Sequence, residues 1–167
     1  MEAVILVGIQ AAGKSTFYRA RFFDTHVRIN LDMLRTRPRE DALLRACLQA
    51  RQPFVVDNTN VTAAERARYV APARLAGFRV VGYFFRPDPR GSIRRNRERA
   101  QAGGRSVPVP GVLGAAKRLE EPALEEGFDV IHEVVIDEAG NFVVRVLAGH
   151  PLPPPAPEDE KREGVEL

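Results

Sequence analysis

Short apolar runs alternate with longer amphipathic stretches along most of the chain. The apolar runs predict β-strands at 3–7, 27–30, 53–57, 79–85 and 129–136, and a hairpin partner for the last of these at 141–147. The stretches between them predict helices at 14–23, 40–51, 62–76, 89–101 and 108–120. Because strands alternate with helices, we predict an α/β fold in which a central parallel sheet carries helices on both faces.

Local signals mark boundaries in this pattern. Thr62 followed by Glu65 matches a capping box and predicts the start of the third helix. The segment 138–141 contains glycine and asparagine and predicts the turn of the hairpin. Beyond it, prolines and then a charged run predict a disordered or loosely attached tail. We therefore divide the chain into one domain at 1–149 and a tail at 150–167.

The segment after the first predicted strand has the spacing G-x-x-x-x-G-K-[ST], which is typical of a phosphate-binding P-loop. Its two glycines allow backbone N–H groups to point at phosphate oxygens, at the start of a helix whose dipole favours anions. The lysine reaches the β- and γ-phosphates and the serine hydroxyl binds Mg²⁺. We expect ATP and Mg²⁺ as cofactors. The predicted nucleotide-binding residues are Gly8, Ala11, Ala12, Gly13, Lys14, Ser15 and Thr16.

Two aspartates follow predicted strands. Asp57 ends the strand at 53–57 and is placed to bind Mg²⁺ together with Ser15, although it could also simply begin a turn. Asp32 follows the strand at 27–30, and Arg35 lies three positions later. If a helix begins there, both side chains lie near one face of its first turn. Asp32 could then accept a proton from a hydroxyl group, and Arg35 could hold a phosphate of the acceptor. Alternatively, Asp32 is only an N-terminal helix residue favoured by the dipole.

The charge is unevenly distributed. The chain carries +3 overall, with −3 after Gly149 and therefore +6 on residues 1–149. Most of the basic residues are arginines, whose planar fork suits phosphate, so nucleic acid stays among the candidate partners. Four arginines crowd the stretch 94–99, and Arg105 follows in a glycine-rich segment. This pattern predicts a lid that closes over the nucleotide, with a solvated basic surface as the alternative.

Composition excludes several classes of protein. Cys47 is the only cysteine, which excludes an intrachain disulfide and a cysteine-rich zinc site. No stretch is apolar enough to cross a membrane, and we expect no signal peptide. We therefore expect a cytoplasmic protein without a membrane partner. Its oligomeric state is left open.

The chain resembles the kinase domain of the polynucleotide 5′-hydroxyl kinase family over about residues 3–136. The resemblance rests on five segments: 8–16, 30–35, 57–60 continued by 66–70, 95–99 with 107–108, and 121–128. The Asp-Asn-Thr-Asn segment and its Arg-Ala-Arg-Tyr-Val continuation are far more specific than the P-loop, which countless proteins share. Leu31 departs from the family, because many members have arginine before the aspartate that follows.

The resemblance implies a three-layer P-loop kinase fold with core strand order 2-3-1-4-5, an arginine-rich lid and a C-terminal hairpin. It implies that Asp32 is the general base, that Arg35 holds an acceptor phosphate, that Arg99 stabilises the transition state and that Arg95 lies near the nucleotide. The implied enzyme is an ATP-dependent kinase that transfers the γ-phosphate to the 5′-hydroxyl end of DNA or RNA.

Two other functions remain open. One is a small-molecule or nucleoside-type kinase on the same scaffold. The other is a non-catalytic regulator that uses the P-loop as a switch. The pair Asp32 and Arg35 argues against the regulator, because a switch needs neither a base nor a clamp for an acceptor.

Overall fold

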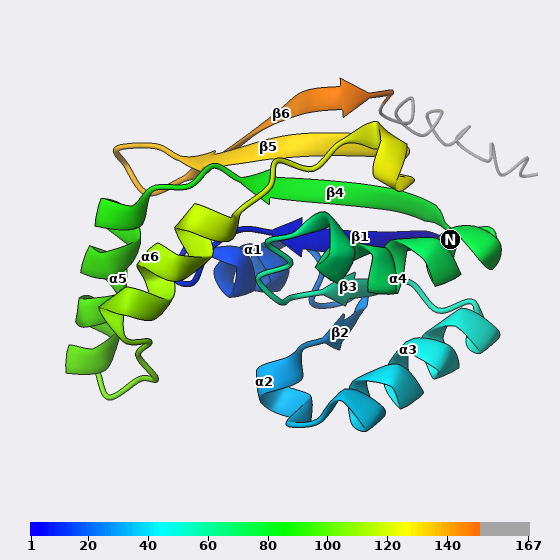
Figure 1. Cartoon of the computed structure of the whole chain (residues 1–167), viewed down its shortest axis with the longest axis horizontal. Helices are drawn as coiled ribbons and strands as arrows, with labels where there is room; N and C mark the ends of the chain where they lie inside the picture. The colour runs from blue at the N-terminus through cyan, green and yellow to red at the C-terminus, as the bar shows by residue number, and fades with distance from the viewer. Residues whose placement is uncertain (151–167) are drawn as a thin grey trace, which may run out of the picture.

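The computed structural model describes residues 1–150 and shows a six-stranded sheet flanked by helices (Figure 1). The strands are β1 (Glu2–Val7), β2 (Val27–Ile29), β3 (Phe54–Val56), β4 (Arg79–Phe85), β5 (Val130–Ile136) and β6 (Phe142–Gly149). The helices are α1 (Lys14–Arg21), α2 (Leu31–Leu34), α3 (Arg37–Ala50), α4 (Ala63–Leu75), α5 (Pro89–Gln101) and α6 (Val109–Arg118), with a 3₁₀ turn, η1, at Leu124–Glu126.

The strand order is β2-β3-β1-β4-β5-β6, which confirms the predicted core order. The first five strands in this order are parallel, and β6 pairs antiparallel with β5 as the predicted hairpin. β1 lies between β3 and β4, so the segment that leaves its carboxyl end emerges at the middle of the sheet (Figure 1). In open α/β sheets this edge is where ligands bind.

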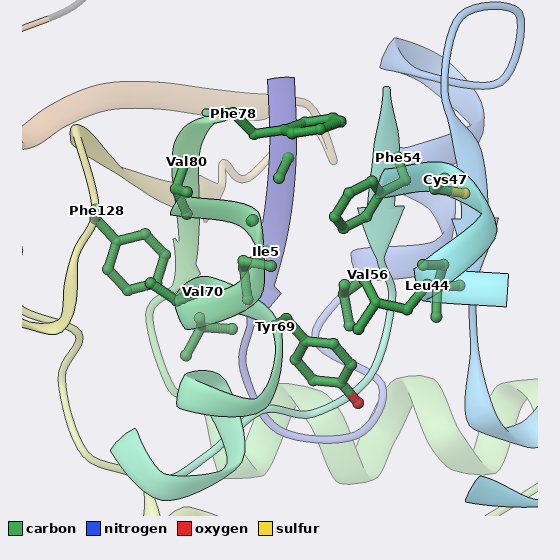
Figure 2. Packing of buried hydrophobic residues seen from close by; sticks show 14 of the residues in the cluster. Ile5, Leu44, Cys47, Phe54, Val56, Tyr69, Val70, Phe78, Val80 and Phe128 are labelled. Atoms are coloured by element: carbon green, nitrogen blue, oxygen red, sulfur yellow. The ribbon is translucent and has the colours of Figure 1, made fainter. Parts of the chain in front are cut away.

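Both faces of the sheet are covered by apolar side chains, which explains why β3 and residues 3–7 of β1 are continuously apolar. On one face Ile5 and Val56 pack against Leu44 of α3 and Tyr69 of α4 (Figure 2). On the other face the alternate β1 residues Val4 and Leu6 belong to a cluster that includes Phe17 of α1 and Val112 of α6. The three predicted layers are therefore present.

Some boundaries differ from the prediction for local reasons. The predicted helix at 40–51 begins at Arg37, because Pro38 is tolerated in a first helical turn, where its missing N–H costs no bond. The short α2 and η1 were not predicted as elements. Thr62 caps α4 by accepting a bond from the Glu65 amide, as expected, but the Glu65 carboxylate accepts from Val61 N rather than from Thr62 N.

Two further expectations concern the C-terminal tail and membrane-spanning segments. The predicted tail at 150–167 lies outside the described residues except for His150, so the boundary at 149 remains a prediction. Within residues 1–150, no helix combines the length and the apolar character that crossing a bilayer requires.

Candidate active site

A cleft of about 950 Å³ opens at the carboxyl ends of β1, β2 and β3. Its floor is formed by the segments that follow these strands, at 10–16, 30–32 and 57–60. Side chains from α4 and from the connection between α5 and α6 form its walls. The cleft collects most of the predicted site residues: Ala11, Ala12, Gly13, Lys14, Ser15, Thr16, Asp32, Asp57 and Arg99.

The predicted P-loop wraps around the start of α1. Gly13 caps this helix in the left-handed region, at φ 98°, which glycine adopts without strain. Gly8 needs the absence of a side chain for another reason, since a Cβ there would lie 2.9 Å from the Cβ of Phe85. The loop is therefore held against β4, and its residues 10–13 line the cleft.

Lys14 lies beneath this loop with only 8% of its surface exposed. Its Nζ donates to the carbonyl oxygens of Gly8 and Ile9, at 2.7 and 2.6 Å. Burial lowers the pKa of Lys14 to about 8, an effect that the Asp57 charge opposes and that Arg99 increases. The negative charge of a bound polyphosphate would favour the protonated form of Lys14 and so raise its pKa.

Ser15 and Asp57 lie together, since Ser15 Oγ donates to Asp57 Oδ2 at 2.8 Å. Both are oxygen donors of the kind that Mg²⁺ prefers, so this pair fits the expected metal. Among residues 1–150 no cluster of three or more acidic, histidine or cysteine side chains could hold an ion. Mg²⁺ would therefore depend on nucleotide phosphates and water for its remaining ligands.

Arg28 is a member of this site that the sequence did not reveal. Its Nε donates to Asp57 Oδ2 at 2.9 Å, and its Nη2 contacts the same oxygen and Ser15 Oγ at 2.5 and 3.1 Å. Arg28 lies in the three-residue strand β2, where one polar position in an alternating pattern indicates only a solvent-facing side chain. Only the pairing of β2 with β3 brings it to Asp57.

Asp32 sits in the first turn of α2, which Asn30 caps by accepting a bond from Met33 N at 2.9 Å. Its carboxylate is exposed, and Arg105 Nη1 lies 2.9 Å from its Oδ1. Asn96 of α5 exchanges two bonds with the backbone of Val107, at 2.6 and 2.9 Å, and so ties the ends of the segment that contains Arg105. The predicted lid thus reaches across the cleft to the predicted base.

Three predicted residues are not among those that line the main cleft: Gly8, Arg35 and Arg95. Arg35 terminates α2 at a positive φ of 73°, is exposed and is not among the residues that line the cleft. Arg95 lines a second cavity of about 340 Å³ between the start of α5 and the end of β5. Its Nε donates to the P-loop carbonyl of Ala11 at 2.8 Å, and burial lowers its pKa.

A buried polar network forms one wall of the cleft. Glu40 is fully buried, and its carboxylate accepts bonds from Arg37, Asn58 and Tyr69 at 2.6, 2.8 and 2.9 Å. Burial and the neighbouring Glu40 raise the pKa of Tyr69 to about 12, so its hydroxyl remains a donor. Asn58 and Tyr69 lie in segments that carry the family resemblance, but the sequence analysis gave neither residue a role. No sequence pattern marked Glu40 as part of the site.

Residues 39–122 match the AAA domain family. This match covers half of the 167 residues. The chain belongs to this family. The matched region begins after the P-loop, so the match is independent of that motif and includes the Asp57 segment, α4 and the lid.

Solved structures share the fold. The chain is similar to one in the Pnkp1/Rnl/Hen1 RNA repair complex, with 24% identity and a TM-score of 0.61, covering 71% of this chain and 43% of that one. It is also similar to a gluconokinase from Sinorhizobium meliloti 1021, with 17% identity, a TM-score of 0.57 and coverage of 82% and 83%.

A third similar structure is Chaetomium thermophilum Kti12 in complex with ADP-AlF3, with 14% identity, a TM-score of 0.61 and coverage of 83% and 92%. At these identities the likeness shows the fold, which is that of P-loop kinases. Together with the family, it supports a nucleotide-using phosphotransferase domain. This AAA domain protein spans less than half the length of the repair-complex chain that it matches.

Proposed function

We propose that this protein transfers the γ-phosphate of ATP to the 5′-hydroxyl end of DNA or RNA. The observation that carries the proposal is the charge of the single cleft that contains both the P-loop and Asp32. Its lining has seven cationic side chains, at positions 14, 19, 28, 37, 68, 99 and 105, and three acidic ones, at 32, 57 and 65. A cationic lining of this kind suits an acceptor that brings phosphates of its own.

The residues divide between donor and acceptor. Lys14 and the loop amides would hold the β- and γ-phosphates. Asp32 would take the proton of the 5′-hydroxyl as its oxygen attacks the γ-phosphorus, while the bond from phosphorus to the β–γ bridging oxygen breaks and ADP leaves. Arg99 would stabilise the charge that spreads over the transferred group. When bound by Ser15 and Asp57, Mg²⁺ would offset the phosphate charge.

The second cavity would take the base of the donor. It adjoins the P-loop at Ala12 and is bounded by Arg95 on one side and by the end of β5 on the other. A planar guanidinium can stack on a nucleobase, which fits the predicted position of Arg95 near the nucleotide. Arg35 does not line the cleft, so its role toward the acceptor stays a prediction.

Similarity to a chain of an RNA repair complex supports the nucleic-acid acceptor, and similarity to a gluconokinase keeps a small-molecule acceptor as the competing outcome. An acceptor panel separates them. The protein is incubated with γ-labelled ATP and, in turn, 5′-hydroxyl oligonucleotides, 3′-mononucleotides, nucleosides and gluconate.

We expect label on the oligonucleotides and 3′-mononucleotides and little on the other acceptors. Lys14→Ala serves as the matched inactive control and should reduce labelling by about 10²–10³-fold, as removal of one preorganised donor does. Equal or better labelling of nucleosides or gluconate would overturn the nucleic-acid assignment. Labelling that survives in Lys14→Ala would show that the P-loop is not the donor site.

A further inference from the structure

Arg37 presents a fixed guanidinium group to the cleft. It is the first residue of α3, lines the cleft close to Asp32 in sequence, and has 46% of its side chain exposed. Its Nη1 donates both to Glu40 Oε2 at 2.6 Å and to the Tyr69 hydroxyl at 3.0 Å. These two bonds use both hydrogens of Nη1.

The remaining edge of the group is free within the part of the chain that the structure describes. Among residues 1–150, neither Nε nor Nη2 of Arg37 has a hydrogen-bond partner. Together these two atoms form the side-on edge of a guanidinium, which matches two oxygens of one phosphate. Arg37 thus uses Nη1 for bonds within the protein, while Nε and Nη2 can donate to a ligand.

The support beneath Arg37 is rigid. Glu40 is fully buried, and its second oxygen accepts bonds from Asn58 and Tyr69 at 2.8 and 2.9 Å. Tyr69 itself is 1% exposed and packs in the core cluster of Figure 2. A guanidinium held in this way loses little rotamer entropy when it binds, since most of that cost is already met in folding.

The same network positions the predicted base. Asn58 donates to Glu40, and its Oδ1 accepts a bond from the backbone N–H of Leu31 at 2.9 Å. Leu31 immediately precedes Asp32 at the start of α2. One carboxamide therefore fixes the helix that carries Asp32 and the carboxylate that orients Arg37, so these two groups keep a constant spacing.

We propose that Arg37, through Nε and Nη2, binds the phosphodiester nearest to the 5′-hydroxyl and selects acceptors that carry this phosphate. This inference rests on the proposed function and names the residue that recognises the substrate class. It differs from the prediction for Arg35, which is exposed, caps α2 and does not line the cleft. A solely structural role is the competing explanation, in which Arg37 only neutralises the buried Glu40 charge.

The test measures binding apart from turnover. A 5′-hydroxyl oligonucleotide with a dye at its 3′ end is titrated with protein and a non-hydrolysable ATP analogue, and fluorescence anisotropy gives the dissociation constant over a range of salt. The variants are Arg37→Gln, Arg35→Gln and, as a control on the exposed surface of α3, Arg45→Gln. Arg37→Lys keeps a charge for Glu40 but lacks the side-on edge, which separates recognition from stability.

We expect Arg37→Gln and Arg37→Lys each to weaken binding by roughly tenfold or more, as loss of a charge-assisted contact does. The slope of log K against log salt should fall by about 0.7, the value for one phosphate of a single strand. Arg45→Gln should change the dissociation constant less than about twofold, because an exposed arginine away from the cleft makes no such contact.

Three outcomes would overturn the proposal: an Arg37→Lys variant that binds like the wild type, an Arg37→Gln variant that behaves like Arg45→Gln, or a large loss in Arg35→Gln alone. Failure of the proposed function looks different. In that case the wild type binds the oligonucleotide without labelling it in the acceptor panel, and the Arg37 comparison still stands as a binding result. A wild type that does not bind the oligonucleotide would overturn both.

Discussion

Lys14 and Arg99 line the same cleft, but they are held there in different ways. Lys14 is 8% exposed and bonded to two carbonyl oxygens of the loop that precedes it. Arg99 is exposed near the end of α5, and its side chain forms no hydrogen bond or ion pair with the residues that the structure describes. The P-loop side of the cleft is therefore organised before a ligand arrives, whereas Arg99 on the lid side is left to make its contacts with the ligand.

This difference has a consequence for mutations. Exposed side chains that pair with no buried charge, such as Arg99 and Asp32, should affect the reaction and leave stability nearly unchanged. Side chains around Asp57 should affect stability as well, because they are buried with a charge. Each of the following predictions tests one part of that contrast.

Arg99→Ala is expected to have the largest effect. An arginine directed at the transferred phosphoryl group contributes about 10³–10⁵-fold in related chemistry, and its loss should lower kcat far more than it raises KM for ATP. The melting temperature should not move. Steady-state kinetics with Arg94→Ala and Arg97→Ala as neighbours of equal charge test placement, since an equal loss in all three variants would indicate bulk charge.

Asp32→Asn should lower kcat by about 10²–10⁴-fold, the range for a general base, while ATP binding is retained. The exposed carboxylate contributes to one ion pair with Arg105, which is also exposed, so stability should change by less than about 1 kcal/mol. Single-turnover rates and nucleotide titration measure the two properties. Arg105→Ala is the comparison, and a loss of the same size in both variants would point to the ion pair rather than to proton transfer.

Arg28→Ala should destabilise the protein by about 2–3 kcal/mol, because Asp57 is 3% exposed and would lose the one ion pair that it forms among the described residues. Urea unfolding measures this change. Arg19 also lines the cleft but forms no ion pair within residues 1–150, so Arg19→Ala should leave the urea midpoint of unfolding unchanged. Replacing both Arg28 by Ala and Asp57 by Asn should recover most of the loss, and a double variant as unstable as Arg28→Ala would contradict the explanation.

Nucleotide affinity should fall as pH rises above about 8. Lys14 has a pKa of about 8 in the free protein, and bound phosphates would raise it, so the complex holds more protons than the free protein. The dissociation constant of an ATP analogue should therefore be lowest below pH 8 and increase by up to about tenfold per pH unit above it. Calorimetry across this pH range measures the dissociation constant, with Lys14→Arg as a control whose side chain does not titrate. If the wild type and Lys14→Arg show the same pH dependence, Lys14 is not its cause.

The sequence predicted the scaffold well because burial dictates its pattern. β4 was predicted with its observed bounds, since five of its seven residues are valine or aromatic and the segment lies between two predicted helices. α2 was missed as an element because four residues show no periodicity, and its position depends on the Asn30 cap and on the Asn58 contact with Leu31 N.

The site was predictable where one local motif contains it and not where distant segments meet. Lys14 and Ser15 follow from the P-loop spacing alone. Glu40 has the sequence signature of a solvent-facing helix residue, yet it is fully buried because partners from two other segments, Asn58 and Tyr69, meet its carboxylate. Arg37 was overlooked because its value as a ligand group depends on the bonds that Glu40 and Tyr69 make to it.

Arg66 bears on the order in which contacts form during folding. Its fully buried guanidinium donates to both oxygens of Glu126 at 2.7 Å and to the carbonyl oxygens of Asn60, Val61 and Glu120. The Glu126 contact spans 60 positions of sequence, so forming it closes a loop that contains β4, α5 and α6. Contacts that close such long loops come late, because the chain must lose the entropy of the loop first. The Arg66 contacts should therefore form after the folding transition state. Substitution of Arg66 should accelerate unfolding more than it slows folding.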